Sequence, residues 1–241
     1  GDMKHLTGFL ALFLCAALPL YAAGLDDLTW TTTNGEVTIT DCDTSASGTL
    51  VIPDTIEGNP VTGIGRAAFE DCKSLTSITI PDSVTSIGDY AFLGCTRLTS
   101  VTFGDNSQLT SIGRAAFFDC TNLTSITIPE RVTIIGDDAF TNCTSLASIT
   151  FTGPVPTTLG ENIFGNIGAG AVVLVSDDFL TSFGEIGANW NGLIIGVNRL
   201  EQLTWTTTGG EVTITDCDTS ASGTLVIPDT IKGNPVTGIG R

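Results

Sequence analysis

A unit of 23 to 25 residues occurs four times in the middle of the chain, and this repeat limits the fold more than any other feature of the sequence. Each copy carries a Phe, a Cys three residues later, a Leu three residues after the Cys, and an Ile or Val three residues after the Leu. The copies begin at Phe69, Phe92, Phe117 and Phe140, which are 23, 25 and 23 residues apart. A fixed period of this length is typical of a solenoid, whose coils bury their apolar faces only by stacking on one another.

A short strand with alternating residues follows the Leu of each copy. We expect Leu75, Ile78 and Ile80 to point into the core, which forces Ser77 and Thr79 onto the outer face of a parallel sheet. The other copies have the same Ser-x-Thr pattern. The candidate ligand-binding residues are these outward hydroxyl side chains: Ser77, Thr79, Ser100, Thr102, Ser125, Thr127, Ser148 and Thr150.

The segment before each Phe predicts another wall of the solenoid. In the second copy this segment reads Ile87-Gly88-Asp89-Tyr90-Ala91, and we expect a helical or 3₁₀ turn there. We expect Gly88 to adopt a backbone conformation that other residues disfavour.

Over residues 50–151 these anchors combine into the pattern A-F-x-x-C-x-x-L-x-x-I-x-I-P-x-x-V-x-x-I-G, which resembles the BspA-type leucine-rich repeat of bacterial surface proteins. The resemblance implies a leucine-rich repeat solenoid, a β-rich, curved, right-handed coil with a parallel β-sheet on its concave face. It also implies a secreted or cell-surface protein that is used for adhesion and has no enzymatic activity.

The chain before the array divides into two segments. Residues 1–23, with two residues ahead of Met3, have the basic start, apolar run and small-residue end of a signal peptide. A retained membrane anchor is the alternative, but the apolar run is short for a span of about 20 residues. Residues 24–49 alternate β-branched and polar residues around Asn34-Gly35, which predicts an N-terminal β-hairpin cap. The repeat array is assigned to residues 50–170.

Residues 171–197 predict a C-terminal strand-helix cap. The apolar residues 171–175 indicate a strand, and Ser176-Asp177-Asp178 indicates the N-terminus of an amphipathic helix. The apolar side of this helix would consist of Phe179, Leu180, Phe183 and Ile186. Trp190 is interpreted as part of the core of this cap rather than of a ligand pocket.

The end of the chain repeats its beginning. After a linker at residues 198–202, residues 203–241 copy residues 28–66 with an offset of 175, and differ only where Asn34 becomes Gly209 and Glu57 becomes Lys232. We interpret residues 203–241 as the truncated start of a second, near-identical module.

Four cysteines follow the repeat, at positions 72, 95, 120 and 143. Equivalent side chains of neighbouring coils lie about 4.8 Å apart, whereas a disulfide needs about 2 Å between its sulfur atoms. We therefore expect a buried ladder of free thiols rather than disulfides, and no metal site, because no His or paired C-x-x-C accompanies them. The repeat assigns no partner to Cys42 or to its copy Cys217.

The charge and the single histidine exclude several classes of function. The chain carries a net charge of −17, which disfavours nucleic acid as a partner, and no membrane insertion is expected after signal cleavage. His5 lies in the predicted signal peptide, so the remaining chain lacks the commonest general base and zinc ligand. No cofactor and no metal is predicted. The carboxylate pairs Asp26-Asp27, Asp137-Asp138 and Asp177-Asp178 are interpreted as solvated residues of loops and helix starts.

The sequence therefore favours a non-enzymatic, secreted or cell-surface recognition or adhesion protein that binds an extracellular protein or glycan through its leucine-rich repeat surface. The alternative is a structural surface spacer built of tandem solenoid modules; ice binding and a secreted hydrolase have less support. The outward hydroxyl row is the first candidate for the binding surface. The rim residues Tyr90, Arg97, Arg114 and Arg131 are the second, because Tyr and Arg are enriched among energetically important interface residues.

Overall fold

The structure is a computed structural model that describes residues 23–185, 187–197, 203–217, 230–231 and 234–239. The predicted signal peptide, apart from Ala23, and the predicted linker at 198–202 lie outside the described residues.

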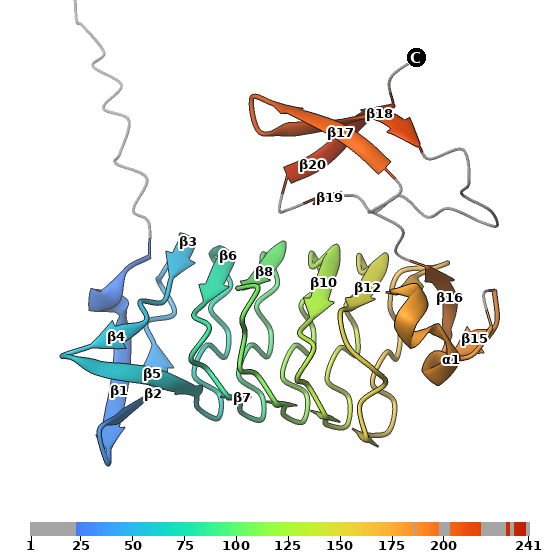
Figure 1. Ribbon diagram of the computed structural model, residues 1–241. Coiled ribbons are helices and arrows are strands. Elements are labelled where there is room, and N and C mark those ends of the chain that lie inside the picture. Colours follow the sequence, from blue (N-terminus) through green and yellow to red (C-terminus); the bar gives the residue numbers. More distant parts are fainter. Residues whose placement is uncertain (1–22, 186, 198–202, 218–229, 232–233, 240–241) are drawn as a thin grey trace, which may run out of the picture.

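Successive coils build two parallel sheets, and this architecture confirms the predicted parallel solenoid (Figure 1). The sheet that contains the Ser-x-Thr strands, called the first sheet, comprises two ladders. The first ladder is β3 (Gly48–Val51), β6 (Leu75–Ile80) and β8 (Ser100–Phe103). The second ladder is β10 (Ser125–Ile128), β12 (Ser148–Phe151), β14 (Val172–Val175) and β16 (Leu193–Val197), with β15 (Asn189–Trp190) antiparallel to β16.

The second sheet is continuous. Its strands, in order, are β1 (Leu28–Thr33), β2 (Glu36–Cys42), β5 (Asn59–Ile64), β7 (Ser86–Ile87), β9 (Ser111–Ile112), β11 (Ile134–Ile135) and β13 (Thr158–Leu159), with β4 (Thr55–Ile56) antiparallel to β5. The sequence did not predict the two-residue strands β7, β9, β11 and β13. An apolar residue followed by Gly does not by itself indicate a strand.

The N-terminal hairpin forms where Asn34-Gly35 predicts it, after a short 3₁₀ helix η1 (Leu25–Asp27). Asn34 and Gly35 have φ angles of 54° and 80°, as a type I′ turn requires. Strand β1 pairs antiparallel with β2, and β2 then pairs in parallel with β5 of the first coil. The hairpin therefore continues the second sheet, while β3 is the outermost strand of the first sheet.

A run of turns, rather than the expected helical or 3₁₀ turn, connects the second sheet to the first in each coil. Alternate amides of this turn wall bond in different directions. The N–H of Phe69 donates to the carbonyl of Ala91 in the next coil at 2.7 Å, whereas the N–H of Cys72 donates to the carbonyl of Phe69 in its own coil at 3.2 Å. A helix cannot form here, because every second N–H donates to a carbonyl of the next coil and not to a carbonyl within its own coil.

The glycine before each turn has a different role from the one expected. Gly88 does not adopt a positive φ; the left-handed conformation falls at Tyr90, with φ of 61°. A Cβ atom on Gly88 would lie 2.7 Å from the nitrogen of Arg66 and 2.7 Å from the carbonyl carbon of Gly65. Glycine is therefore required because the neighbouring coil approaches too closely for a side chain.

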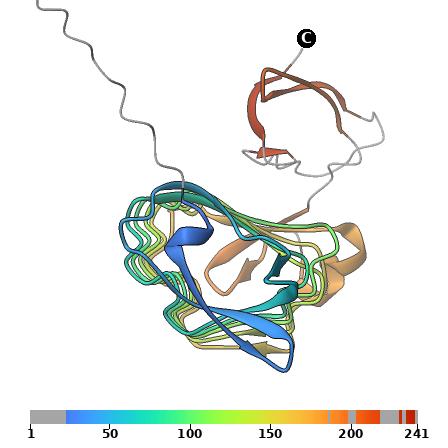
Figure 2. The same ribbon diagram turned by 90° about the vertical axis from the view of Figure 1, so that its left-hand side faces the viewer.

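The core is a stack of phenylalanine rings, one from each coil. Ring centroids are 4.9 Å apart for Phe69 and Phe92, 5.0 Å for Phe92 and Phe117, and 5.2 Å for Phe117 and Phe140, and the planes differ by 3° to 6°. These four side chains are fully buried. Seen end-on, the coils superimpose around this shared interior (Figure 2).

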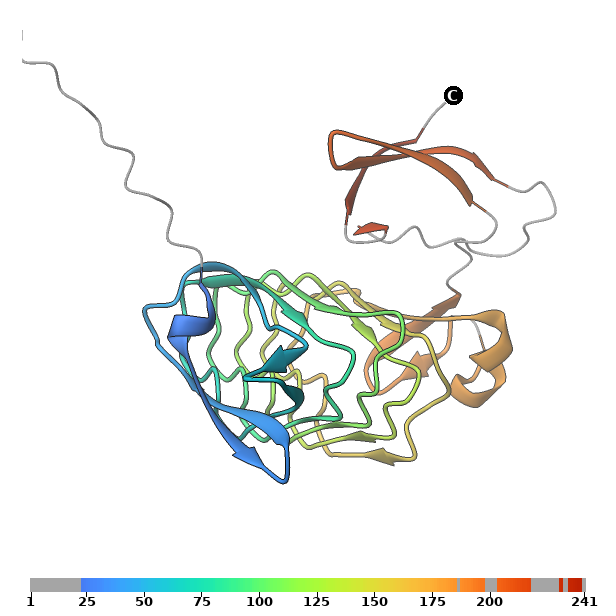
Figure 3. The same ribbon diagram turned by 60° about the vertical axis from the view of Figure 1, so that its left-hand side comes forward.

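The chain from 171 to 197 extends the first sheet, since β14 pairs in parallel with β12 and β16 with β14. The helix predicted here is shorter than expected. It consists of a 3₁₀ turn η2 (Asp177–Phe179) and α1 (Leu180–Phe183), drawn in orange (Figure 3). It ends where Gly184 adopts φ of 130°. Ile186 lies outside the described residues.

The aromatic residues of this segment pack together, and Trp190 is half-buried against the core. The Trp190 ring lies 5.6 Å from that of Phe151, edge-on, and 5.0 Å from that of Phe183. Phe183 in turn lies 5.0 Å from Phe151. The three rings join the end of the array to α1.

The second copy begins with the same supersecondary unit as the first. Its strands are β17 (Leu203–Thr208), β18 (Glu211–Cys217), β19 (Thr230–Ile231) and β20 (Asn234–Ile239). Strand β17 pairs with β18 in the register of β1 with β2, including the bulge, and β18 pairs in parallel with β20 as β2 does with β5. Nearly identical sequence thus gives the same strand pairing.

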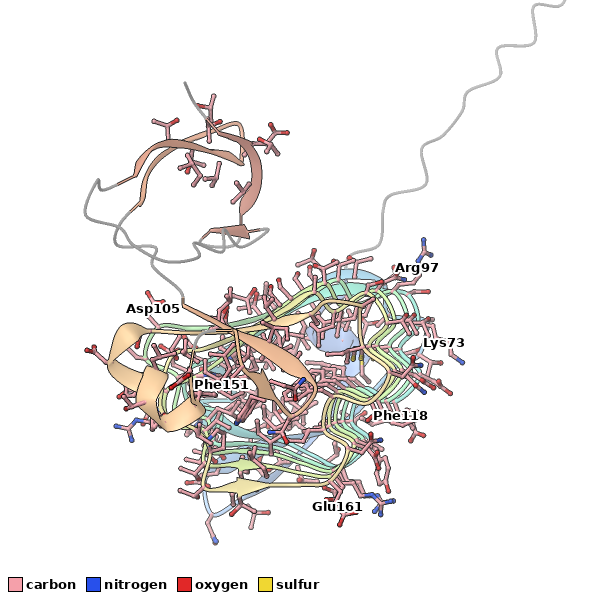
Figure 4. All side chains as sticks on the ribbon, turned by 90° about the vertical axis from the view of Figure 1, so that its right-hand side faces the viewer. Lys73, Arg97, Asp105, Phe118, Phe151 and Glu161 are labelled. Carbon is pink, nitrogen blue, oxygen red and sulfur yellow. The ribbon has the colours of Figure 1, made fainter. Side chains whose placement is uncertain are left out.

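The phenylalanine stack makes a prediction about stability. Phe117→Ala should lower the free energy of unfolding by about 3 to 5 kcal/mol, because it leaves a cavity between two stacked rings. Phe118→Ala is the matched control, since Phe118 is the adjacent residue but lies on the outer surface of the turn wall (Figure 4) and should cost much less. Urea denaturation followed by circular dichroism measures both; equal losses would contradict the assigned core.

Candidate binding surface

The eight predicted hydroxyl residues occupy the outer side of the first sheet, and we call this set the hydroxyl face. The registered pairs are Ser77 with Ser100, Thr79 with Thr102, Ser125 with Ser148 and Thr127 with Thr150. The alternation is as expected, because Ile78 between Ser77 and Thr79 is only 1% exposed. The structure therefore brings these residues onto one side of successive coils.

The hydroxyl face begins one strand earlier than the sequence analysis placed it. The hydroxyl of Ser77 donates to the hydroxyl of Thr49 in β3 at 2.8 Å. Val51 pairs in register with Thr79 and is 61% exposed. The sequence could have predicted Thr49 and Val51, because Leu50 and Ile52 are spaced like the inward residues Ile78 and Ile80 of β6.

At its other end the face does not include an accessible Ser148. This side chain is only 7% exposed, which corrects the expectation that all eight hydroxyl residues face solvent. Ser148 lies between Ser125 of β10 and Val172 of β14. In β14, Val172 and Leu174 replace the Ser-x-Thr pair, and Leu174 is fully buried, so the accessible hydroxyl row ends before β14.

The first sheet is interrupted in the middle. Strands β8 and β10 stand next to each other in Figure 1, but the described residues form no hydrogen-bonded ladder between them. The coil that separates them is the one with 25 rather than 23 residues. Its extra residues lie in a loop at 104–108, directly after β8.

A hollow of about 350 Å³ opens beside this loop. Its lining comes from three successive coils, and the residues are Phe103, Gly104, Asp105, Asn106, Ser107, Gln108, Thr127, Pro129, Glu130, Arg131 and Thr152. Apart from Thr127 and Arg131, none of these residues was singled out from the sequence. The longer interval between Phe92 and Phe117, 25 residues rather than 23, could have pointed to the loop residues.

The loop has its own internal hydrogen bonds. The N–H of Ser107 donates to the carbonyl of Gly104 at 3.2 Å, and the N–H of Gln108 donates to the carbonyl of Asp82 in the preceding coil at 2.8 Å. Leu109, which follows the loop, is fully buried. The loop is therefore attached to the core at its end and to the preceding coil through its backbone.

The rim arginines do not gather at one place. Arg97, Arg114 and Arg131 are all exposed, but only Arg131 lines the hollow. Figure 4 shows Arg97 on the opposite side of the coils from Asp105. Tyr90 instead packs with Arg66, whose guanidinium carbon lies 4.9 Å from the ring centroid in a cation–π contact.

The cysteines form the predicted ladder of buried free thiols. Each thiol reaches back to the preceding coil: Cys95 donates to the carbonyl of Phe69 at 3.0 Å, and Cys143 to that of Phe117 at 3.1 Å. Cys42, whose partner the sequence did not assign, lies at the N-terminal end of the ladder and is hydrogen-bonded to Cys72. These groups are structural and not available for chemistry.

Burial makes these thiols poor nucleophiles. Desolvation raises the pKa of Cys95 and Cys120 well above the usual range and raises the pKa of Cys143 to about 12. The hydrogen bond between Cys42 and Cys72 raises the pKa of Cys42 and lowers that of Cys72. Because only the thiolate reacts readily, the raised pKa makes Cys95, Cys120 and Cys143 poor nucleophiles at neutral pH.

The paired carboxylates have local structural roles. A carboxylate oxygen of Asp27 accepts a hydrogen bond from the N–H of Gly24 at 2.8 Å, and one of Asp138 accepts from the side-chain amide of Asn162 at 2.7 Å. Within the described part of the chain, no three His, Cys, Asp or Glu side chains are grouped so that they could hold a metal ion. Searching the same residues reveals no helix of the length and apolarity that crossing a bilayer demands.

Comparison with known proteins agrees with this geometry. The family described as "BspA type Leucine rich repeat region" matches residues 55–182 in six copies, which is more than half of the 241 residues. The chain therefore belongs to the BspA-type leucine-rich repeat family. Proteins of this family are typically secreted or located on the cell surface, and their solenoids are typically non-enzymatic.

Several solved structures are similar to the chain. A leucine-rich repeat protein from Bacteroides capillosus is 35% identical, with a TM-score of 0.46, over 53% of this chain and 95% of that one. A leucine-rich cell-surface protein from Faecalibacterium prausnitzii is 25% identical, with a TM-score of 0.48, over 78% of this chain and 59% of that one. A leucine-rich repeat protein from T. pallidum is 23% identical, with a TM-score of 0.44, over 66% of this chain and 92% of that one. Among curated proteins, none matches the chain.

The thiol ladder predicts how stability depends on pH. In the folded state the pKa of Cys143 is raised to about 12. As the pH rises, this thiol therefore stays neutral in the folded protein at pH values at which the same thiol is already ionised in the unfolded chain. Its contribution to stability is complete below the unfolded pKa of about 8.5 and is lost as the pH rises toward the folded value, by up to about 1.4 kcal/mol per pH unit.

Urea denaturation between pH 8 and pH 10.5, in wild type and in Cys143→Ala, tests this. The free energy of unfolding should fall with pH in both proteins, and less steeply in the variant because one buried thiol is gone. If the free energy of unfolding fell equally steeply with pH in both proteins, the pKa of Cys143 would not be raised by burial.

Proposed function

We propose that the protein is a non-enzymatic recognition protein of the cell surface or the extracellular space, and that it binds an extracellular protein through the hydroxyl face. The observation that carries the proposal is a pair of registered sets of Ser and Thr side chains, one across β6 and β8 and one across β10 and β12. Ser100, Thr102 and Thr127 are exposed, and the others except Ser148 are half-buried. Most of these hydroxyl groups lie free of the core and have no role in stacking the coils.

The composition of the row suits contact with another macromolecule. Short hydroxyl side chains lose little conformational entropy on binding and offer both a donor and an acceptor. Exposed Val51 at the N-terminal end of the row adds apolar contact area. Successive coils repeat this surface, and repeat proteins use such extended surfaces to bind partners.

An enzymatic role has no support in the described residues. The cysteines are buried, with the pKa of Cys95, Cys120 and Cys143 raised, and the paired carboxylates Asp27 and Asp138 are held in local hydrogen bonds. Neither a nucleophile with an adjacent base nor two facing carboxylates is formed by these groups.

A structural spacer is the second candidate, and one observation favours it. Strands β17, β18 and β20 repeat the pairing of β1, β2 and β5 in the same register. Tandem copies of one module lengthen a protein without adding a new surface. The two functions differ in whether substitutions on the hydroxyl face change binding.

The test is the double variant Thr79→Lys and Thr102→Lys in the full chain. These residues are adjacent on neighbouring strands, and two lysines would place bulky, charged side chains in the middle of the face without touching the core. Binding to immobilised collagen, laminin and fibronectin, measured by surface plasmon resonance up to about 10 μM, should weaken at least tenfold for the probe that binds.

The control is the double variant Thr85→Lys and Thr110→Lys, which adds the same charge to exposed threonines at the second sheet. It should bind like the wild type. No binding to any of the three probes, or equal weakening in both double variants, would contradict recognition through the hydroxyl face and favour the spacer.

A further inference from the structure

The hollow beside the 104–108 loop has no role in holding the solenoid together. The coils on either side stack through Phe92 and Phe117 at 5.0 Å and through the thiol of Cys120, which donates to the carbonyl of Phe92 at 3.2 Å. Strands β8 and β10 therefore lack a hydrogen-bonded ladder where the longer loop follows β8, while the turn wall keeps its regular spacing. The two additional residues create a concave site in an otherwise regular surface.

We propose that this hollow is a binding site for one unit of a neutral glycan. The proposal rests on the surface-recognition function above and concerns a different site and a different class of ligand from the hydroxyl face. Its volume of about 350 Å³ lies at the small end of the range for sites that hold small molecules. That size suits a single sugar unit better than a folded protein surface.

The lining has the two kinds of group that a sugar ring needs. Phe103 is half-buried, packs against the core and offers an apolar surface to the C–H groups of a sugar. Asn106 and Arg131 carry planar groups that offer two or more hydrogen-bonding atoms side by side. Gln108 offers its amide oxygen, while its NH₂ group donates to the carbonyl of Asn106 at 2.6 Å. Neighbouring hydroxyl groups of a sugar can pair with such groups, because each hydroxyl is both a donor and an acceptor.

The charges around the hollow indicate that the ligand is neutral. Asp105 and Glu130 line it together with one cation, Arg131. A carboxylate oxygen of Asp82 lies buried against Gly104 and has no hydrogen-bond partner among the described residues. With two carboxylates and one guanidinium in its lining, the carboxylate of Asp82 behind Gly104 and a chain charge of −17, the site disfavours sialic acid, uronic acids and phosphate.

The position of the hollow allows a longer glycan to continue beyond it. Thr127 belongs to the hydroxyl face and also lines the hollow, and Thr152 lies in the next coil. A chain that leaves the hollow past Thr127 would therefore meet the hydroxyl groups of the first sheet. A glycan can use both surfaces without a change in the fold.

The experiment uses the full chain and named sugars. Galactose, glucose, mannose and N-acetylglucosamine, with sialic acid, glucuronic acid and inorganic phosphate as anionic probes, are screened by saturation-transfer NMR, and binders are measured by calorimetry. At least one neutral sugar should bind with a dissociation constant on the order of 1 mM, as expected for few polar contacts, and the anionic probes should not bind.

The double variant Gln108→Ala and Arg131→Ala should weaken that binding at least tenfold. Its matched control is Asn122→Ala and Arg97→Ala, which removes the same kinds of exposed group outside the hollow and should leave binding unchanged. Thermal unfolding of the two variants should be alike and close to the wild type, because all four side chains are exposed and each variant loses one side-chain hydrogen bond, from Gln108 to the Asn106 carbonyl or from Asn122 to the Thr96 carbonyl.

The proposal is overturned if no neutral sugar binds at about 10 mM, if an anionic probe binds instead, or if both double variants weaken binding equally. Protein binding through the hydroxyl face is judged separately by the Thr79→Lys and Thr102→Lys variant, whose residues do not line the hollow. Loss of sugar binding with intact protein binding, or the reverse, therefore shows which of the two proposals fails.

Discussion

The distance between neighbouring coils is the constraint on which the rest of the structure depends. Backbone hydrogen bonds hold successive strands about 4.8 Å apart, and every side chain that recurs in the repeat must tolerate that spacing. Phenylalanine does so by stacking its rings at 4.9 to 5.2 Å, and cysteine by donating its thiol to the carbonyl of the preceding coil. Gly88 does so by having no side chain where the backbones meet.

The sequence predicts what the repeat phase determines. Phe, Cys, Leu and Ile recur at fixed positions, so the core and the outward direction of Ser77 and Thr79 follow from counting residues. The turn wall could not be predicted in the same way, because its left-handed residues include Ala67 and Tyr90, which do not signal a positive φ. Only the bonding of alternate amides between coils explains that conformation.

Departures from the repeat were harder to interpret than the repeat itself. The spacing of 25 residues is visible in the sequence, but whether extra residues bulge outward or open a hollow depends on how β8 and β10 separate. Ser148 is buried next to Val172, its partner in β14, and no single copy of the repeat reveals this pairing. The regular part of the chain forms the scaffold and the hydroxyl face, and the irregular part forms the hollow beside the 104–108 loop.

Hydrogen exchange of the turn-wall amides tests most directly whether stacking between coils holds the structure together. The N–H of Phe92 donates to Ala116 at 2.7 Å, and the N–H of Phe117 donates to Ala139 at 2.8 Å. If the coils form one cooperative unit, both amides should exchange only through global opening, with a free energy equal to that of unfolding measured with urea. Exchange of either amide with a free energy several kcal/mol lower would show that the coils open one at a time and would contradict this account.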